Sequence, residues 1–498
     1  MPMNADASAK SARGPALLAL VWLGGVLYAA MLMSPSIGAH IKFGLTFNEM
    51  LSNLLQGRFD IDPAIIRGEA FEHDGRSYAY FGVFCALLRL PLLLTGKIGV
   101  DMTAASQLIA AAVSLACRLA IATTILNRAK GAPLNPLLRA AVLVGIATNG
   151  ESVQYLHPSI YQEVIAWGDA LAALFVLFAA RRILGFSERR AWTYAAMATV
   201  AGLALMCRVS FGLGLYGALA YMLAAEALTA QPVRRRIAGI VRTLAPAAAI
   251  LAVFAVLAGG VNYARWGNPL TFVPLRYQAI AHRLYPDRAP RLQRYGEVNL
   301  RRVPFSLQYY FAPIWAVTDN KGDFILQRPQ VDLFEDVELP PSSFLLSDPV
   351  TCILAALGLM ALSLRPQTLV NPALARAAQL GLALPACLML TAISLTFRYR
   401  MEFYPALDFA AWLGLAALAN RTSPLPGVAT SVLGSMSLAG MAVAAVSLLI
   451  YAIVPLGPAT DLNTPHGWTG LIADRLAGRE VHRGHLMPDG RRIPLDGI

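Results

Sequence analysis

The sequence has 498 residues, of which 57% are hydrophobic and 14% are charged, and its net charge is +12. An ordinary soluble protein carries about a quarter charged residues, so this composition excludes that class. Membrane proteins concentrate Lys and Arg in cytoplasmic loops, which explains the positive charge, and we therefore expect no nucleic-acid partner. The five cysteines lie in apolar runs without paired spacing, which favours small core residues over disulfides or metal ligands.

Long apolar runs follow one another along most of the chain. They cover 15–33, 105–126, 137–153, 163–181, 192–209, 211–229, 244–261, 346–364, 377–396, 403–420 and 428–454. Runs of roughly 17–25 residues are long enough to cross a bilayer core. The pattern predicts an all-α polytopic membrane protein with about eleven transmembrane helices and a retained first helix.

A further apolar stretch, 80–96, determines the predicted topology because it is short and contains Arg89 and Pro91. If this stretch lies along the outer surface of the membrane, most Lys and Arg residues between the spans fall in short cytoplasmic loops, as the positive-inside rule requires. We therefore predict a cytoplasmic N-terminus and an extracytoplasmic C-terminus. A single membrane domain, 1–498, then carries a first outer loop at 34–104 with juxtamembrane helices, a second at 262–345, and an outer tail at 456–498. We find no internal repeat.

The first outer loop holds the densest group of ionisable residues. Its segment FNEMLSNLLQG, which includes Glu49, predicts an amphipathic helix that ends at Gly57. Asp60 and Asp62 follow, and residues two apart in an extended chain face the same way. Such a pair can bind a divalent cation or act as acid and base, although a solvated turn explains the same residues.

Other candidates lie between this pair and the second span. Glu69 is a candidate catalytic carboxylate, and Arg76 and Tyr78 are candidates for substrate binding. Asp74 precedes Gly75 and is better explained by a turn. Arg89, at the expected headgroup level, either binds a lipid-linked phosphate or extends to lipid phosphate without a specific role.

The short outer loop ESVQYLHPSIYQE contributes His157 and Glu163. His157 is either a loop residue or an acceptor ligand. Glu163 begins a span, where a carboxylate favours the positive end of the helix or takes part in catalysis.

Basic residues also lie at the outer ends of later spans. Arg208 ends the fifth, and the loop FRYRMEF contains Arg398, Arg400 and Glu402. Arginines in a short outer loop break the inside-positive pattern, and Glu402 can pair with one of them. We therefore expect an anionic partner such as phosphate on this face.

The order of these features along the chain resembles that of GT-C superfamily glycosyltransferases. The features are GRFDID, DGRSYAYFGVFCALLRLP, Glu163 at the start of span four, NYARWGNPLTF (262–272) and RYRMEFYPAL (398–407). That superfamily includes the protein O-mannosyltransferases and the lipid A aminoarabinose transferases. The resemblance implies a GT-C-like membrane fold and a polyprenyl-phosphate-linked sugar as donor. Many members carry a catalytic acid directly after the first span, where this chain reads SPSIGAHIKFG without one. The candidate base is therefore Glu49, Asp60, Asp62 or Glu69.

These features lead to the hypothesis of a glycosyltransferase in the bacterial inner membrane, with its active site on the extracytoplasmic face. A carboxylate deprotonates a hydroxyl of a glycan, lipid or protein acceptor, which displaces the polyprenyl phosphate from the sugar. The catalytic candidates are Asp60, Asp62, Glu69 and Glu163; the phosphate-binding candidates are Arg89, Arg208, Arg398 and Arg400; the acceptor-binding candidates are Glu49, Arg76, Tyr78, His157 and Glu402. The sequence establishes no cofactor, and a divalent cation at Asp60 and Asp62 stays open.

Two other classes stay open. A transporter or flippase of lipid-linked glycans normally shows internal repeats and a charged site near the middle of the membrane. A glycan polymerase or ligase shares the lipid-linked donor and normally has a large late outer loop, which 262–345 partly matches.

Overall fold

The structure is a computed structural model. It describes residues 5–34, 43–132, 134–186, 190–229, 233–279, 288–313, 333–338, 340–364 and 371–453, with 473, 476–478, 484–486 and 492–494 from the C-terminal tail.

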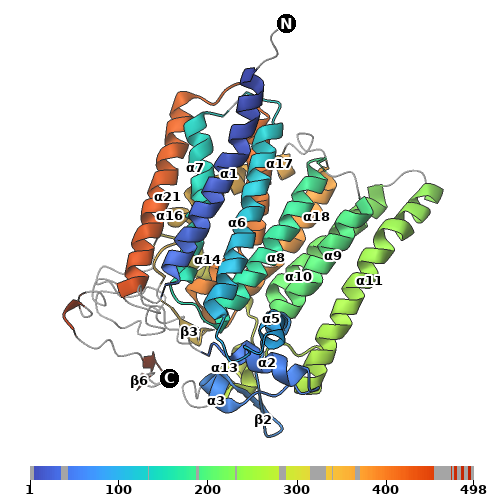
Figure 1. Cartoon of the computed structure of the whole chain (residues 1–498), viewed down its shortest axis with the longest axis vertical. Helices are drawn as coiled ribbons and strands as arrows, with labels where there is room; N and C mark the ends of the chain where they lie inside the picture. Colours follow the sequence, from blue (N-terminus) through green and yellow to red (C-terminus); the bar gives the residue numbers. More distant parts are fainter. Residues whose placement is uncertain are drawn as a thin grey trace.

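Long apolar helices form a bundle in which most axes run in roughly the same direction (Figure 1). In chain order, the helices of the bundle are α1 (Ala5–Leu32), α6 (Thr103–Arg128), α7 (Pro136–Ala147), α8 (Ile160–Ile183), α9 (Arg190–Cys207), α10 (Val209–Thr229), α11 (Val233–Trp266), α17 (Pro349–Leu364), α18 (Pro372–Leu382), α19 (Leu384–Thr391), α20 (Tyr404–Ala419) and α21 (Gly427–Ile453). Within the described residues, six segments are long and apolar enough to cross a membrane: α6, α8, α10, most of α11, α18 with α19, and α21. The predicted all-α polytopic membrane fold is confirmed.

Two predicted runs differ in detail from the helices found. The run 377–396 divides into α18 and α19 near Pro385, which lies in the first turn of α19, where proline is tolerated. The run 137–153 also divides, because its α-helix α7 ends at Ala147. Asn149 then caps a separate 3₁₀ helix, η3 (Gly150–Tyr155), by accepting a hydrogen bond from the backbone N–H of Glu151 at 3.2 Å.

The stretch 80–96 forms two short helices, α4 (Phe84–Leu87) and α5 (Leu90–Leu94), and neither is long enough to cross a bilayer. Leu87, Leu90 and Leu94 are exposed, whereas Arg89 between the two helices is buried. The stretch 80–96 is therefore not a single spanning helix, and its position on the outer membrane surface stays a prediction.

The smaller elements gather at the end of the bundle opposite the start of α1 (Figure 1). They include α2 (Thr46–Leu54), α3 (Pro63–Ile66), β1 (Phe71–His73), β2 (Arg76–Tyr78), α13 (Arg288–Tyr295), α14 (Val303–Phe311) and β3 (Asp336–Val337), whereas α16 (Phe344–Ser347) lies beside α21 within the bundle. Strands β1 and β2 form an antiparallel hairpin, and Asp74 and Gly75 in its turn both have positive φ angles, as an Asp-Gly turn requires.

Backbone contacts join the first loop to the second at this end. The N–H of Ala279 donates to the carbonyl of Ala70 at 2.8 Å, and Phe71 forms a bridge with Gln278. Strand β3 pairs in parallel with β4 (Ser394–Leu395). Segments from three distant parts of the sequence therefore meet at one end of the bundle.

Candidate functional site

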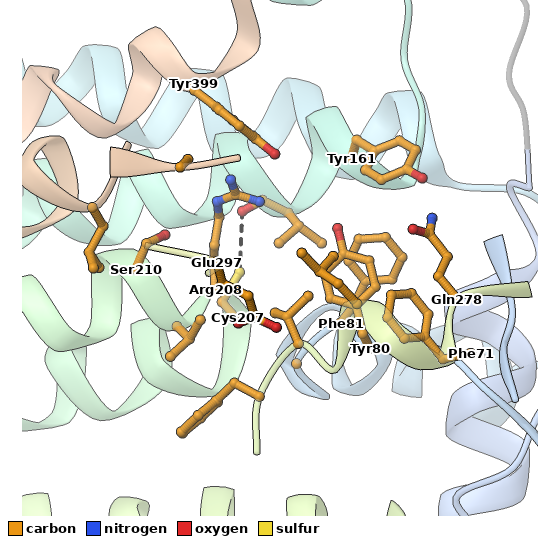
Figure 2. Close-up of a pocket in the computed structure, with 18 of the residues that line it drawn as sticks. Phe71, Tyr80, Phe81, Tyr161, Cys207, Arg208, Ser210, Gln278, Glu297 and Tyr399 are labelled. Carbon is orange, nitrogen blue, oxygen red and sulfur yellow. Dashed lines mark hydrogen bonds between the residues drawn. The ribbon is translucent and has the colours of Figure 1, made fainter. Parts of the chain in front are cut away.

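A cavity of about 580 Å³ lies where the first loop meets α9, α10, α11 and the segment after β4. Its apolar lining includes Phe71, Phe81, Leu205, Ala258 and Leu388. Its polar lining includes Glu69, Tyr80, Tyr161, Arg208, Arg398 and Tyr399, and Figure 2 shows several of these side chains around the hollow. A mostly apolar cavity with a few convergent polar groups is the usual form of a ligand site.

Arg208 occupies the tip of the α9–α10 hairpin, since α9 ends at Cys207 and α10 begins at Val209. The first loop touches this tip directly: a Cβ atom added at Gly82 would lie 1.9 Å from the carbonyl oxygen of Met206. Glycine is therefore required there by the close approach of two backbones. Nε of Arg208 donates to Oε1 of Glu402, which is buried.

Arg398 and Arg400 lie on the 3₁₀ helix η8 (Phe397–Glu402) and have different surroundings. Nη2 of Arg400 lies 2.7 Å from Oδ2 of Asp348, in a buried ion pair outside the cavity lining. Arg398 lines the cavity, with its guanidinium 4.7 Å from the ring centre of Tyr161 and 5.6 Å from that of Tyr399. Within the described chain, no carboxylate lies within ion-pair distance of Arg398.

Glu69 ends the 3₁₀ helix η2 (Arg67–Glu69) and lines the same cavity. Its Oε2 accepts a hydrogen bond of 3.0 Å from Nε2 of Gln278, from the second loop. No cation of the described residues forms an ion pair with Glu69.

Two further lining residues contribute to the chemistry of the cavity. Burial raises the pKa of the Tyr80 hydroxyl above its ordinary value, so this group stays protonated and can donate a hydrogen bond. Partial burial also raises the pKa of the Glu297 carboxyl, which the sequence did not single out.

Arg89 and Glu163 pair with each other outside the cavity lining. Nη2 of Arg89 lies 2.8 Å from Oε2 of Glu163, and their side chains are 1% and 0% exposed. Nε of Arg89 donates to Oδ1 of Asn48 at 3.1 Å. The pair joins the stretch 80–96 to the start of α8, so both charges are engaged inside the protein.

Asp60, Asp62 and Glu49 are engaged in local contacts of the first loop. Asp62 caps α3, since its Oδ1 accepts from the N–H of Ala64 at 2.8 Å, and Asp60 lies 3.3 Å from Arg58. Oε1 of Glu49 accepts from the N–H of Asp62 at 3.0 Å. Across the described residues, no three His, Cys, Asp or Glu side chains are grouped to hold a metal ion.

The other acceptor-binding candidates also lie outside the cavity lining. Arg76 is exposed on β2, and Tyr78 is buried 5.3 Å from the ring of Trp266. His157 is buried, with a ring nitrogen 3.4 Å from the carbonyl oxygen of Tyr451. Among the candidates named from sequence, the structure therefore brings together Glu69, Arg208 and Arg398 at the cavity.

The bundle also contains a buried ionic cluster that the sequence did not predict. Arg118 of α6 lies 2.7 Å from Glu151, 2.8 Å from Asp169 and 2.7 Å from Asp408. Asp169 and Asp408 are acids within apolar runs, and their position in the sequence was the feature that could have indicated a buried ionic cluster. The cluster connects α6, η3, α8 and α20, and the two cavities that Arg118 lines measure about 60 and 20 Å³.

Comparison with known proteins gives a distant likeness. No protein-family model and no curated protein matches the chain. Similar solved structures include the archaeal oligosaccharyltransferase AglB from Archaeoglobus fulgidus in complex with an inhibitory peptide and a dolichol-phosphate, at 15% identity and a TM-score of 0.48. Another is the Archaeoglobus fulgidus oligosaccharyltransferase tethered by a disulfide to an acceptor peptide with the NVT sequon, at 14% identity and a TM-score of 0.48.

Both comparisons cover 89% of this chain, which spans 56% of the length of those solved chains.

Proposed function

We propose that this multi-pass membrane protein is a glycosyltransferase that uses a polyprenyl-phosphate-linked sugar in the cavity of Glu69, Arg208 and Arg398. The observation that carries the proposal is that Arg398 lies in a ligand-sized cavity without a carboxylate partner among the described residues. A guanidinium binds phosphate oxygens in paired, charge-assisted hydrogen bonds. Arg398 is therefore suited to hold the phosphate of the donor, with Arg208 beside the same cavity.

The surroundings of the cavity support a donor held in the membrane. Ala258 and Val261 of α11 line the cavity, and neighbouring residues of α11, such as Val256 and Leu257, are exposed on the outside of the bundle. Exposed apolar residues on a membrane helix face lipid acyl chains. A polyprenyl chain can therefore reach this side of the cavity from the bilayer while its phosphate lies near Arg398.

Glu69 is suited to act as the general base. In the proposed reaction its carboxylate takes the proton of an acceptor hydroxyl, whose oxygen attacks the anomeric carbon of the sugar. The bond from that carbon to the phosphate oxygen breaks, and its electron pair leaves on the polyprenyl phosphate. Arg398 and Arg208 stabilise the negative charge on the departing phosphate. Asp60 and Asp62 are the alternative bases predicted from sequence, but their contacts lie outside the cavity lining.

From the charge distribution of the sequence we propose that this cavity lies on the extracytoplasmic face of the bacterial inner membrane. The acceptor is a hydroxyl-bearing glycan, lipid or protein. The buried Arg118 cluster is a feature that a transporter would share. The cavities beside it, however, are about the size of one or two water molecules and too small for a glycan.

The experiment uses the full-length protein in lipid nanodiscs. A polyprenyl phosphate serves as a probe that does not depend on the sugar, and a panel of radiolabelled polyprenyl-phosphate sugars tests transfer. We expect binding of the lipid phosphate and transfer from at least one donor. Failure to bind the lipid phosphate, with the protein folded, would contradict the proposal.

A further inference from the structure

Arg265 is a second arginine of the cavity whose charge has no counter-ion. It lies in the last turn of α11, lines the cavity, and is 4% exposed. Its Nη1 donates to the carbonyl oxygen of Phe81 at 2.8 Å, while its buried Nε has no hydrogen-bond partner. Among the described residues, no carboxylate lies within ion-pair distance of Arg265.

Other buried arginines show how the chain normally compensates such a charge. Arg89, Arg118 and Arg400 each pair with at least one carboxylate. Arg302 has no ion pair within the described chain, but its guanidinium donates to the backbone carbonyls of four residues: Leu333, Glu297, Thr391 and Gly296. Arg265 donates to only one backbone carbonyl among the described residues, that of Phe81. A buried cation with so little compensation is costly unless an anion approaches it.

We propose that Arg265 binds a second phosphate group, separate from the one held by Arg398. Arg265 belongs to the α11 wall, whereas Arg208 and Arg398 come from the α9–α10 tip and η8. Asn262, one turn before Arg265, also lines the cavity. This inference rests on the proposed function, since it divides one substrate cavity into two anion sites. The second phosphate has two possible sources. It is either one of the two phosphates of a polyprenyl diphosphate donor, with Arg398 holding the other, or a phosphate group on the acceptor.

The test measures binding by the full-length protein in nanodiscs, and its first arm uses the unaltered chain. Affinities are measured for a polyprenyl phosphate, for a polyprenyl diphosphate, and for inorganic phosphate added to protein already loaded with the polyprenyl phosphate. If the second phosphate belongs to the donor, the polyprenyl diphosphate should bind at least about tenfold more tightly than the polyprenyl phosphate. This is the gain expected from one hydrogen bond to a charged group. If the second phosphate belongs to the acceptor, inorganic phosphate should bind saturably to protein that already holds the polyprenyl phosphate.

The second arm assigns the effect to Arg265. We expect Arg265→Gln to remove whichever of the two effects the unaltered protein shows, Arg265→Lys to retain part of it, and binding of the polyprenyl phosphate to persist in both variants. The exposed Arg301→Gln serves as a matched control that loses one arginine outside the cavity lining.

The outcomes separate this inference from the proposed function. If the unaltered protein neither prefers the diphosphate nor binds phosphate when loaded, the second site is refuted whether or not the variants fold. An effect that persists in a folded Arg265→Gln variant refutes the role of Arg265. Loss of polyprenyl phosphate binding in the unaltered protein instead contradicts the proposed function.

Discussion

Arg208 and Glu402, which are 194 residues apart in the sequence, form an ion pair that joins the α9–α10 tip to η8. Because Glu402 pairs with Arg208 and Arg400 pairs with Asp348, Arg398 has no ion-pair partner among the described residues. The sequence raised the question of which arginine Glu402 would pair with, Arg398 or Arg400. In the structure Glu402 pairs with neither of them. The guanidinium of Arg398 is therefore available at the cavity for an anionic ligand.

The role of Arg398 is tested by Arg398→Gln, which removes the charge and keeps a hydrogen-bonding side chain. Hydrogen bonds to charged groups contribute about 1.5–3 kcal/mol, so polyprenyl phosphate should bind about 10- to 100-fold more weakly. Binding to the purified protein in nanodiscs measures the effect, and Arg301→Gln is the control. Unchanged affinity in a folded variant would remove Arg398 from the phosphate site.

The role of Glu69 is tested by comparing Glu69→Gln with Asp62→Asn. Loss of a general base typically lowers the rate by about 10²- to 10⁴-fold, and Glu69→Gln should do so without weakening the binding of polyprenyl phosphate. Asp62→Asn should retain transfer, because asparagine also caps helices well. Rates of sugar transfer at saturating donor give the comparison. The reverse pattern, with transfer lost in Asp62→Asn and kept in Glu69→Gln, would return the base to the first-loop aspartates predicted from sequence.

The buried pair of Arg89 and Glu163 should contribute to the free energy of unfolding and should have little effect on the rate of sugar transfer. Glu163→Gln leaves the Arg89 charge buried without its counter-ion, a change that typically costs about 3–5 kcal/mol. The double variant Arg89→Gln with Glu163→Gln should recover part of that loss. Thermal unfolding in detergent measures stability, and transfer is compared per amount of folded protein. A fully stable Glu163→Gln variant that has lost transfer would instead support the catalytic role considered from sequence.

The orientation of the chain is tested by single cysteines at exposed positions on the two faces. Glu72 on β1 should face the outside, and Ser423 between α20 and α21 should face the cytoplasm. In intact cells, a membrane-impermeant maleimide should label Glu72→Cys, whereas Ser423→Cys should react only after permeabilisation. The parent protein controls for labelling of the native cysteines. Labelling of Ser423→Cys alone in intact cells would invert the predicted topology.

The sequence predicted the bundle well because burial of backbone polar groups in lipid demands long apolar helices, and these leave a clear pattern. The absence of a spanning helix in 80–96 was predictable from its short length and from Arg89 and Pro91 within it. The partners of the charged residues were not predictable, because each pairing depends on how distant segments meet: Arg89 with Glu163 across 74 residues, and Arg400 with Asp348 across 52. Arg265 was missed because a single arginine at the end of an apolar run usually extends to the membrane surface.

The most direct test of the central claim is an experimental structure of the full-length protein in nanodiscs with a polyprenyl phosphate bound. We predict density for the phosphate within hydrogen-bonding distance of Arg398, beside Arg208 and on the same cavity as Glu69, with the polyprenyl chain leaving along the α11 side. A bound lipid phosphate elsewhere on the protein, with the cavity of Glu69 and Arg398 empty at saturating lipid, would contradict the account.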